Sequence, residues 1–521
     1  MATVFTGPII GIDLGTTYSS VAIYRNNNAE IIPNHIGKYS TPSIYAVTTT
    51  ERKVGTDAQK HGMKNPLETL FDSKRMIGLP FSHHEIQSLI NEWPFTIIDE
   101  NGKPVYSIDR GESTQTFTPV EVSSFILAYL KEQAEIFLGR TITRAVITCP
   151  AYFSENQKQA TIEAAELAGL HVEHLLTEPT AAALAYGISA NHTNVHYLMV
   201  FDFGGGTLDI SILHLNGNRF TAVATHGDNH CGGRDIDNAL TRFLAEKFQE
   251  QSGEDIRGNP RALAKLRSAA EDAKIALSSS VIASIDLQYL VTDIDFTYDI
   301  KRTDFELLCE ETFQHCISCA QSALIDAGLT ANDLDKILLV GGSSCIPRIQ
   351  ELLKEAFGDK LSHEIHPDEA VAKGAAIQAS LLDADSIPEP SPIELATPLT
   401  SKSSLPNIEL VEIIPYDLGV LIKDGSIPPV IYRNSPFGTI GRQTYQNATA
   451  NNSTAHINIF EVPLPMEGSP KRLGTVELAM EPGSVGSTLI DVTFEYDKNG
   501  ILTVKAKNRN TNKIETLKIK R

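Results

Sequence analysis

Two segments of this chain repeat one pattern, an apolar run that ends in an aspartate and is followed by glycine and threonine. The first covers residues 9–17 and contains Asp13, and the second covers residues 200–207 and contains Asp202. A second apolar run closely follows each turn, so each copy predicts a β-hairpin with polar residues at its tip. Two such hairpins facing each other predict a cleft between two related lobes.

The residue types at these tips are suited to binding a polyphosphate. Glycine lets backbone N–H groups approach phosphate oxygens closely. An aspartate alone would repel a phosphate, so Asp13 and Asp202 indicate a divalent cation between the carboxylates and the ligand. The alternative is that both are ordinary turn-capping residues. The duplication favours a nucleotide site.

Composition argues against several other classes of function. The formal net charge is −20 and no long basic run occurs, so we expect neither a nucleic-acid nor a membrane-surface partner. No apolar stretch approaches the ~20 residues that span a bilayer. The N-terminus has no secretory pattern, and we expect a cytoplasmic protein. Cys316 and Cys319 form a C-x-x-C motif in a predicted helix, and we interpret them as packing residues.

The pattern of residues divides the chain into three parts. Residues 1–381 alternate strand-like and helix-like runs, which predicts an α/β domain with helices that include 122–138 and 347–357. Residues 382–414 contain a Pro- and Ser-rich insert and a short apolar linker. Residues 415–521 contain short alternating runs and predict an antiparallel β-sandwich.

Further motifs resemble those of a known family. The segments 12–19 (IDLGTTYS), 200–211 (VFDFGGGTLDIS) and 337–347 (ILLVGGSSCIP) resemble the three signatures of the seventy-kilodalton heat-shock chaperones, in the same order. Shorter matches lie at 71–78, 148–153, 178–183, 227–238 and 366–370. The resemblance implies a two-lobed, actin-like (ribonuclease H-like, duplicated) ATPase domain, joined by a linker to a β-sandwich that binds extended or unfolded polypeptide. It also implies ATP, ADP, Mg²⁺ and K⁺ as ligands, with a J-domain co-chaperone and a nucleotide-exchange factor as partners.

The resemblance assigns roles to residues near the hairpins. Asp13 and Asp202 are expected to hold Mg²⁺ through water molecules. Lys74 matches the position that stabilises the departing γ-phosphate, and Glu178 and Asp209 match positions that orient the attacking water. The expected catalytic residues are Lys74, Glu178, Asp202, Thr207 and Asp209.

The nucleotide contacts expected from the family are spread along the chain. They are Gly15, Thr16, Thr17, Gly204, Gly205, Gly206, Gly232, Gly233, Glu271, Lys274, Ser278, Gly341, Gly342, Ser343 and Asp368. Ile275 and Cys345 replace two family arginines that sandwich the adenine. Losing two cation–π contacts predicts ATP binding that is weaker by about five-fold or more, with relaxed discrimination between bases.

Coupling between the domains is expected to be loose. Pro150 fits the family pattern, but Lys158 replaces an arginine that relays the nucleotide state. Glu409 interrupts the apolar run of the linker, and a charge weakens docking into an apolar groove. The linker residues expected to act in coupling are Leu410, Val411 and Glu412.

In the predicted β-domain, alignment with the family places five residues around the peptide groove, namely Val420, Lys423, Tyr445, Ala448 and Ala455. Ala455 stands for a bulkier residue and is expected to enlarge the central pocket. Lys423 stands where an apolar residue is usual and is expected to favour acidic or polar neighbours. The alternative is that these are ordinary core and loop positions. No helical region like the family's lid follows the predicted sandwich in this sequence, and either the chain is truncated or it is a naturally lidless member; without a lid, we expect bound peptide to leave quickly.

We therefore predict an ATP-hydrolysing chaperone. The nearest alternative is a non-cycling relative, either a holdase or an exchange co-chaperone with weak ATP turnover. A small-molecule kinase on the same fold would not explain the β-domain. A filament-forming protein is excluded less firmly, because the contacts between subunits of a polymer leave no clear sequence motif.

Overall fold

A computed structural model describes residues 7–48, 51–111, 113–190, 195–229, 231–384, 408–462, 470–497 and 500–519. The chain forms two compact units, one of residues 1–220 and 226–408 and the other of residues 221–225 and 409–521. Most of the predicted Pro- and Ser-rich insert, at 385–407, lies outside the described residues. No helix in the described part of the chain is long and apolar enough to cross a membrane.

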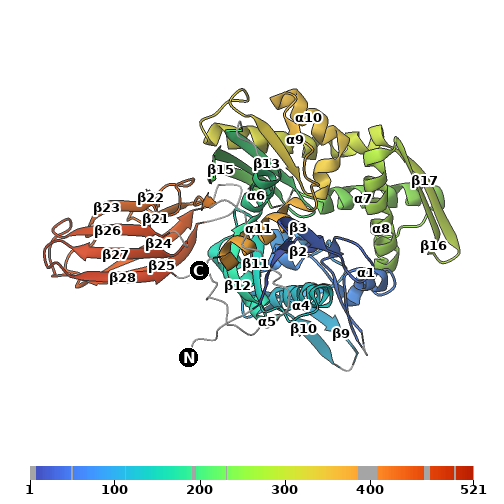
Figure 1. Ribbon diagram of the computed structural model, residues 1–521. Helices are drawn as coiled ribbons and strands as arrows, with labels where there is room; N and C mark the ends of the chain where they lie inside the picture. Colours follow the sequence, from blue (N-terminus) through green and yellow to red (C-terminus); the bar gives the residue numbers. More distant parts are fainter. Residues whose placement is uncertain are drawn as a thin grey trace. The chain divides into compact units, whose positions relative to one another are not determined.

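Two large mixed sheets of the first unit share one strand order (Figure 1). The first sheet has the order β12-β11-β1-β2-β3, and the second has the order β19-β18-β13-β14-β15. In each sheet, the strand that ends in the motif aspartate runs parallel to one neighbour and antiparallel to the other. Their bounds are β1 (Ile9–Asp13), β2 (Tyr18–Arg25), β3 (Asn28–Ile32), β11 (Arg144–Cys149), β12 (His171–Thr177), β13 (Tyr197–Phe203), β14 (Leu208–Asn216), β15 (Arg219–Asp228), β18 (Lys336–Val340) and β19 (Leu361–Ser362).

Both predicted hairpins are confirmed by the strand pairing. In the first hairpin Asp13 pairs with Ser20 across β1 and β2. In the second, Asp202 lies directly opposite Asp209 across β13 and β14. The two carboxylate-bearing turns therefore occupy equivalent places in two sheets of the same order.

Smaller elements complete the first unit. Two three-stranded sheets have the orders β10-β9-β8 and β6-β5-β7, and β16 pairs with β17 alone. The bounds are β4 (Thr41–Pro42), β5 (Tyr45–Val47), β6 (Arg52–Val54), α1 (Thr56–Gly62), η1 (Pro66–Glu68), β7 (Thr69–Leu70), α2 (Ser73–Met76), α3 (His84–Leu89), β8 (Thr96–Glu100), β9 (Lys103–Asp109), β10 (Thr114–Phe117), α4 (Pro119–Leu138), α5 (Glu155–Leu167), α6 (Glu178–Ala190), α7 (Gly233–Ser252), α8 (Pro260–Ser279), β16 (Ile282–Val291), β17 (Ile294–Lys301), α9 (Arg302–Asp326), η2 (Gly342–Cys345), α10 (Pro347–Phe357) and α11 (Ala370–Ala384).

Local signals explain where the helices begin. The helix predicted at 347–357 has these bounds in α10. The helix predicted at 122–138 begins three residues earlier, at Pro119, because Thr118 and Glu121 form a capping box. Thr118 Oγ1 accepts a bond from the Glu121 amide at 3.1 Å, and Glu121 Oε2 accepts one from the Thr118 amide at 2.8 Å.

Helices α6 and α11 pack against each other in the middle of the first unit (Figure 1). Helix α11 also contacts β1, β2 and β11, and α6 contacts β13 and β14, so this helix pair lies between the two large sheets. The helices approach closely at Gly374, where an added Cβ atom would lie 1.8 Å from the carbonyl oxygen of Ala181. Only glycine fits there without moving the helix.

The second unit consists of two four-stranded antiparallel sheets, ordered β22-β21-β24-β25 and β23-β26-β27-β28. Both sheets contribute to one hydrophobic core, which includes Leu418, Ile459, Val492 and Phe494. A short strand, β20 (Glu409–Val411), is next to β15 in strand order, and residues 221–225 of β15 belong to this unit. The other bounds are β21 (Asp417–Val420), β22 (Pro429–Ile431), β23 (Ile440–Gln446), β24 (Thr454–Val462), β25 (Lys471–Ala479), β26 (Leu489–Tyr496), β27 (Leu502–Asn508) and β28 (Ile514–Ile519).

We predict that Gly374→Ala destabilises the protein by up to about 2 kcal/mol. Alanine gains about 1 kcal/mol of helix propensity, but the clash with Ala181 forces α6 and α11 apart, and overpacking costs about 1–3 kcal/mol. Denaturant unfolding measures the difference. Gly258→Ala is the matched control, because nothing lies within 4 Å of its added Cβ atom. Equal stability of the two variants would contradict the close helix contact.

Candidate active site

The tips of the two hairpins meet. An added Cβ atom on Gly205 would lie 2.0 Å from Thr17 Oγ1, and one on Gly206 would lie 2.6 Å from Thr16 Oγ1. Glycine is therefore required at the second tip because side chains of the first tip fill the space. Backbone N–H groups and threonine hydroxyls from two distant parts of the sequence are brought together at this point.

A buried lysine and four carboxylates lie beside the tips. Lys74, in the short helix α2, donates from Nζ to Glu178 Oε1 at 2.6 Å, and both side chains are buried. Glu178 is the first residue of α6. Asp13 accepts a hydrogen bond from Thr148 Oγ1 at 3.3 Å, and Thr207 Oγ1 donates to Asp209 Oδ2 at 2.9 Å. Asp202, at the end of β13, completes the cluster. The structure thus brings together all five expected catalytic residues and Asp13.

Burial and mutual repulsion raise the pKa of the three aspartates. Burial, followed by the charge of Glu178, raises the pKa of Asp13 to about 7 and that of Asp209 to about 7. The same two causes raise the pKa of Asp202 well above its ordinary range, and the charge of Asp13 contributes, which indicates that these two carboxyls are neighbours. Burial alone would lower the pKa of Lys74, but Glu178 and Asp13 raise it, so this lysine stays charged.

One ammonium group cannot neutralise four carboxylates, so the cluster is suited to an additional cation. Oxygen ligands with this excess of negative charge fit Mg²⁺. Among the described residues, no three His, Cys, Asp or Glu side chains are arranged to hold a metal ion directly. Residues of this cluster therefore fit a Mg²⁺ ion held through water and phosphate oxygens, rather than one enclosed by protein ligands.

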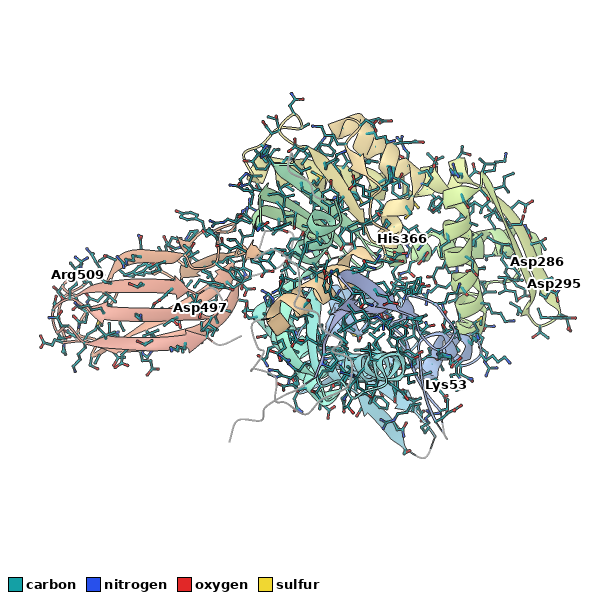
Figure 2. All side chains as sticks on the ribbon, in the orientation of Figure 1. Lys53, Asp286, Asp295, His366, Asp497 and Arg509 are labelled. Atoms are coloured by element: carbon teal, nitrogen blue, oxygen red, sulfur yellow. The ribbon has the colours of Figure 1, made fainter. Side chains whose placement is uncertain are left out.

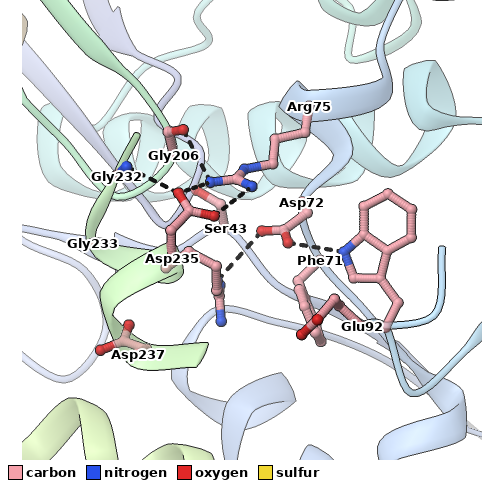
Figure 3. A network of polar contacts seen from close by, with 12 residues as sticks. Ser43, Phe71, Asp72, Arg75, Glu92, Gly206, Gly232, Gly233, Asp235 and Asp237 are labelled. Atoms are coloured by element: carbon pink, nitrogen blue, oxygen red, sulfur yellow. Dashed lines mark hydrogen bonds and ion pairs between the residues drawn. The ribbon is translucent and has the colours of Figure 1, made fainter. Parts of the chain in front are cut away.

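A second polar network supports the glycine turns (Figure 3). Arg75 donates to both carboxylate oxygens of Asp235, at 3.2 and 2.8 Å, and to the carbonyl oxygen of Gly206 at 3.0 Å. Asp235 also accepts a hydrogen bond from the amide of Gly232 at 2.9 Å. Arg75 and Asp235 were not predicted from the sequence as site residues. Both residues lie within segments that resemble the family, 71–78 and 227–238, and Arg75 directly follows Lys74, so these are the signals that could have drawn attention to them.

Asp72 connects the same network to an aromatic cluster. It accepts a hydrogen bond from Trp93 Nε1 at 3.0 Å and lies 3.5 Å from the Nε atom of Arg234 (Figure 3). The guanidinium of Arg234 also lies over the ring of Phe71, 4.8 Å from its centroid. These contacts hold the segment before Lys74 against the start of α7.

The expected nucleotide contacts on later segments also converge near the second hairpin. Ser343 Oγ donates to the carbonyl oxygen of Gly204 at 2.9 Å, and the amide of Gly233 donates to the same oxygen at 2.9 Å. Lys274 lies 2.7 Å from Asp237 Oδ1 and donates to the carbonyl oxygen of Gly233 at 3.3 Å. An added Cβ atom on Gly342 would lie 3.3 Å from Asp368 Oδ1, and Gly341 approaches Asp202.

Helix α8 carries the expected contacts to the nucleoside. Glu271 Oε1 accepts a hydrogen bond from the Tyr18 hydroxyl at 3.0 Å, which ties α8 to the first hairpin. Ser278 is half-buried on this helix. Ile275 is 58% exposed, and Cys345 is exposed at the end of η2. Both replacements of the family arginines are therefore accessible to solvent and free to contact a ligand.

The residues expected to act in coupling lie in both units. Pro150 is buried directly after β11, and Lys158 is buried on α5, 3.6 Å from Glu155. In the second unit Leu410 and Val411 are half-buried in β20, and Glu412 follows them.

The residues expected around a peptide groove have different environments. Val420 is buried in the core of the second unit, and Tyr445 and Ala455 are half-buried against that core. Lys423 and Ala448 are exposed. Val420 therefore has the environment of an ordinary core residue, whereas Lys423 and Ala448 are accessible to a ligand.

Comparisons with known proteins match nearly the whole sequence to one family. The family model described as "Hsp70 protein" matches residues 9–521. "Heat shock cognate 70 kDa protein 3" of Dictyostelium discoideum is 39% identical over 516 residues, which cover 98% of this chain and 80% of the relative. "Heat shock 70 kDa protein 2" of Paracoccidioides lutzii is 41% identical over 515 residues, 98% of this chain and 76% of the relative. "Heat shock 70 kDa protein BIP3" of Oryza sativa subsp. japonica is 39% identical over 515 residues, 98% and 75%.

The raised pKa values predict how stability depends on pH. Asp209 has a folded pKa of about 7 against an ordinary value of 3.8, so the folded protein binds the extra proton between these values. The stability that this proton confers is present at low pH and is lost as the pH rises through about 7. Asp209→Asn should therefore gain stability relative to the parent protein between pH 5 and pH 8, by about 1–3 kcal/mol.

Denaturant unfolding at several pH values, without Mg²⁺ and nucleotide, measures this gain. Asp255→Asn is the matched control, because Arg257 lowers the pKa of this exposed carboxyl to about 2 and it stays ionised throughout the range. A difference between Asp209→Asn and the parent that does not change with pH would contradict the buried, proton-binding carboxyl.

Proposed function

The chain belongs to the Hsp70 family, and from this premise we propose that it hydrolyses ATP and uses the nucleotide state to control its affinity for extended or unfolded polypeptide. The heat-shock chaperone role follows from the family. The observation that carries the ATPase proposal is the buried cluster of Lys74, Glu178, Asp13, Asp202 and Asp209 beside two opposed glycine turns. The small-molecule kinase alternative explains none of the second unit.

We propose that the first unit is a two-lobed, actin-like ATPase domain and that the second unit is the polypeptide-binding β-sandwich. The shared strand order of the two large sheets supports the first assignment. The two antiparallel sheets around one core support the second. The proposed boundaries are 1–381 for the ATPase domain, 382–414 for the insert and linker, and 415–521 for the sandwich.

Each residue of the cluster has a proposed part in phosphoryl transfer. When bound, Mg²⁺ supplies positive charge to the triphosphate, and Asp13 and Asp202 would hold it through water molecules. Lys74 stabilises the charge of the departing γ-phosphate. Glu178 and Asp209 orient the attacking water and accept its proton, and burial, which raises the pKa of Asp209 to about 7, suits this carboxyl to act as a base at neutral pH. No covalent nucleophile is required.

The binding of ATP also depends on the surrounding glycine turns. Gly204–Gly206 and Gly341–Gly342 would present backbone N–H groups to the phosphates, and Thr16, Thr17 and Thr207 would add hydroxyl contacts. Potassium ions near the phosphates are part of the same proposal. Arg75 acts as a positioning residue, because it fixes the second glycine turn through its bond to the carbonyl oxygen of Gly206.

Partners and location follow the same family logic. We propose a J-domain co-chaperone and a nucleotide-exchange factor as partners, and an extended peptide as the ligand of the sandwich. All six cysteines are free thiols, which supports a reducing compartment such as the cytosol.

A non-cycling holdase or exchange co-chaperone is the second candidate. Ile275, Cys345, Lys158 and Glu409 all depart from the family pattern at positions for adenine binding or coupling. The buried Lys74–Glu178 pair favours the hydrolysing enzyme, because it holds a charged ammonium group beside the glycine turns, where it can stabilise a departing phosphate. Single-turnover hydrolysis of ATP separates the two candidates, and stimulation by peptide then tests coupling.

Lys74→Met is predicted to reduce single-turnover hydrolysis of Mg·ATP by about 100-fold or more, because one preorganised charge at the transition state has an effect of this size. ATP binding should change far less, since the glycine turns and metal contacts remain. Lys103→Met, at an exposed lysine of β9, is the matched control. Hydrolysis within two-fold of the parent, in a variant that melts normally, would remove Lys74 from the mechanism.

Restoring the two arginines is predicted to tighten ATP binding. The double variant Ile275→Arg/Cys345→Arg should bind ATP about five-fold or more tightly than the parent, and should discriminate more strongly against GTP, because each cation–π contact contributes about 0.5–2 kcal/mol. Titration calorimetry with ATP and GTP measures both quantities. The control is Ile325→Arg, at another exposed apolar residue, which lies on α9. Unchanged ATP affinity would mean that neither position faces the adenine.

A further inference from the structure

A pocket of about 790 Å³ lies in the first unit, apart from the candidate active site. None of its lining residues belongs to that site. Its walls come from β6, α1 and α4, and the aromatic side chains of Tyr45, Phe125 and Tyr129 form its apolar part. Lys53, on β6, lies at the surface of the first unit (Figure 2). Pockets of this size accommodate ligands or short chain segments.

The open edge of a β-strand borders this pocket. Strand β6 is the outer strand of the sheet β6-β5-β7. The four consecutive residues 51–54 all line the pocket. Side chains alternate between the two faces of a strand, so four consecutive lining residues indicate that the edge, rather than one face, borders the pocket. An open edge offers unpaired N–H and C=O groups to which an extended segment can add as a further strand.

The lining holds four basic side chains and three acidic ones, so it is slightly basic although the whole chain has a formal net charge of −20; these side chains are Arg52, Lys53, Lys60, Lys64, Glu51, Asp57 and Glu132. Glu51 pairs with Lys53 at 3.1 Å, so one of the lining acids is neutralised, and Asp57 lies 3.4 Å from His35 Nε2, a contact that is ionic only when the imidazole is protonated. The guanidinium of Arg52 lies over the ring of Phe125, 4.9 Å from its centroid.

Two further lysines of the pocket have no such partner. Lys60 and Lys64 are exposed, and among the described residues neither forms an ion pair. They lie on or just after α1, and Glu132 of α4 is also part of the lining. The pocket therefore has cationic groups available for a ligand beside the open strand edge.

The floor of the pocket contains a polar group without a partner. The side chain of Tyr45 is fully buried and stacks on Phe125, with ring centroids 4.4 Å apart. Its hydroxyl forms no hydrogen bond with any residue that the structure describes. A buried hydroxyl is costly without a partner, but this one has no exposed surface, so binding at the pocket does not depend on it.

We propose that this pocket binds an extended acidic segment of a partner protein, which adds as a strand to the edge of β6. Alternate side chains of such a strand point to opposite sides. One set would direct carboxylates to Lys60 and Lys64, and the other would contact the aromatic residues. A small anion would contact the lysines alone. An extended polypeptide would contact the lysines and also pair with the outer strand, so the two features together favour a polypeptide.

The test uses an acetylated and amidated peptide of about eight residues that alternates glutamate and valine. In hydrogen-exchange experiments on the full chain, this peptide should slow exchange of the amides of residues 52–54. In fluorescence anisotropy it should bind about ten-fold more weakly to Lys60→Glu/Lys64→Glu than to the parent. A lysine–valine peptide of the same length should not bind.

The matched control is Lys103→Glu/Lys301→Glu, which makes the same change of net charge at two exposed lysines without ion pairs among the described residues. It should bind as the parent does, and thermal unfolding verifies that both double variants are folded. Equal weakening in both would mean a general charge effect and would overturn the proposal.

Three other outcomes would also overturn it. Displacement of the peptide by pyrophosphate at equal concentration would identify a small-anion site. Loss of binding in Ala455→Phe with no loss in Lys60→Glu/Lys64→Glu would place the peptide in the sandwich instead. Binding without protection of residues 52–54 would exclude strand addition. None of these results bears on ATP hydrolysis, so they leave the proposed function to its own tests.

Discussion

The proposed active site depends on one electrostatic constraint, which is that four carboxylates and a single ammonium group are buried together. Burial penalises each charge, and the carboxylates repel one another, so the pKa values of Asp13, Asp202 and Asp209 all rise. The contact of Lys74 with Glu178 at 2.6 Å neutralises only part of this charge. An uncompensated buried charge is costly, so this arrangement suits a bound cation that completes it. The rest of the site can be understood as the structure needed to hold these groups in place.

The duplicated architecture supplies that structure. Asp13 and Asp202 stand at the ends of equivalent strands in two sheets of the same order. Between the sheets, α6 and α11 pack at backbone contact through Gly374, and α6 begins with Glu178. The same helix pair therefore fixes the separation of the sheets and the position of a charged residue of the cluster. The fold and the chemistry are constrained by the same packing.

Sequence reasoning recovered what is encoded locally. The hairpins, α10 and the strands of the second unit follow from periodicity and turn residues close in the chain. It did not recover contacts between distant segments, such as the double hydrogen bond from Arg75 to Asp235 or the bond from Trp93 to Asp72. No local pattern specifies these pairs, because each partner becomes meaningful only after the two sheets are assembled. The early start of α4 was missed for a different reason, since its capping box lies outside the apolar period.

The two ends of the proposed nucleotide site are held by different elements. The chain can therefore depart from the family pattern at the base end alone. The phosphate end is built from the hairpin tips and the buried cluster, where substitution disturbs the packing of both sheets. The base end is built from exposed positions of α8 and η2, and neither Ile275 nor Cys345 supports the core. The bond from Tyr18 to Glu271 is a direct connection between the ends. We therefore propose that a change at Ile275 alters recognition of the base while leaving the charged cluster intact.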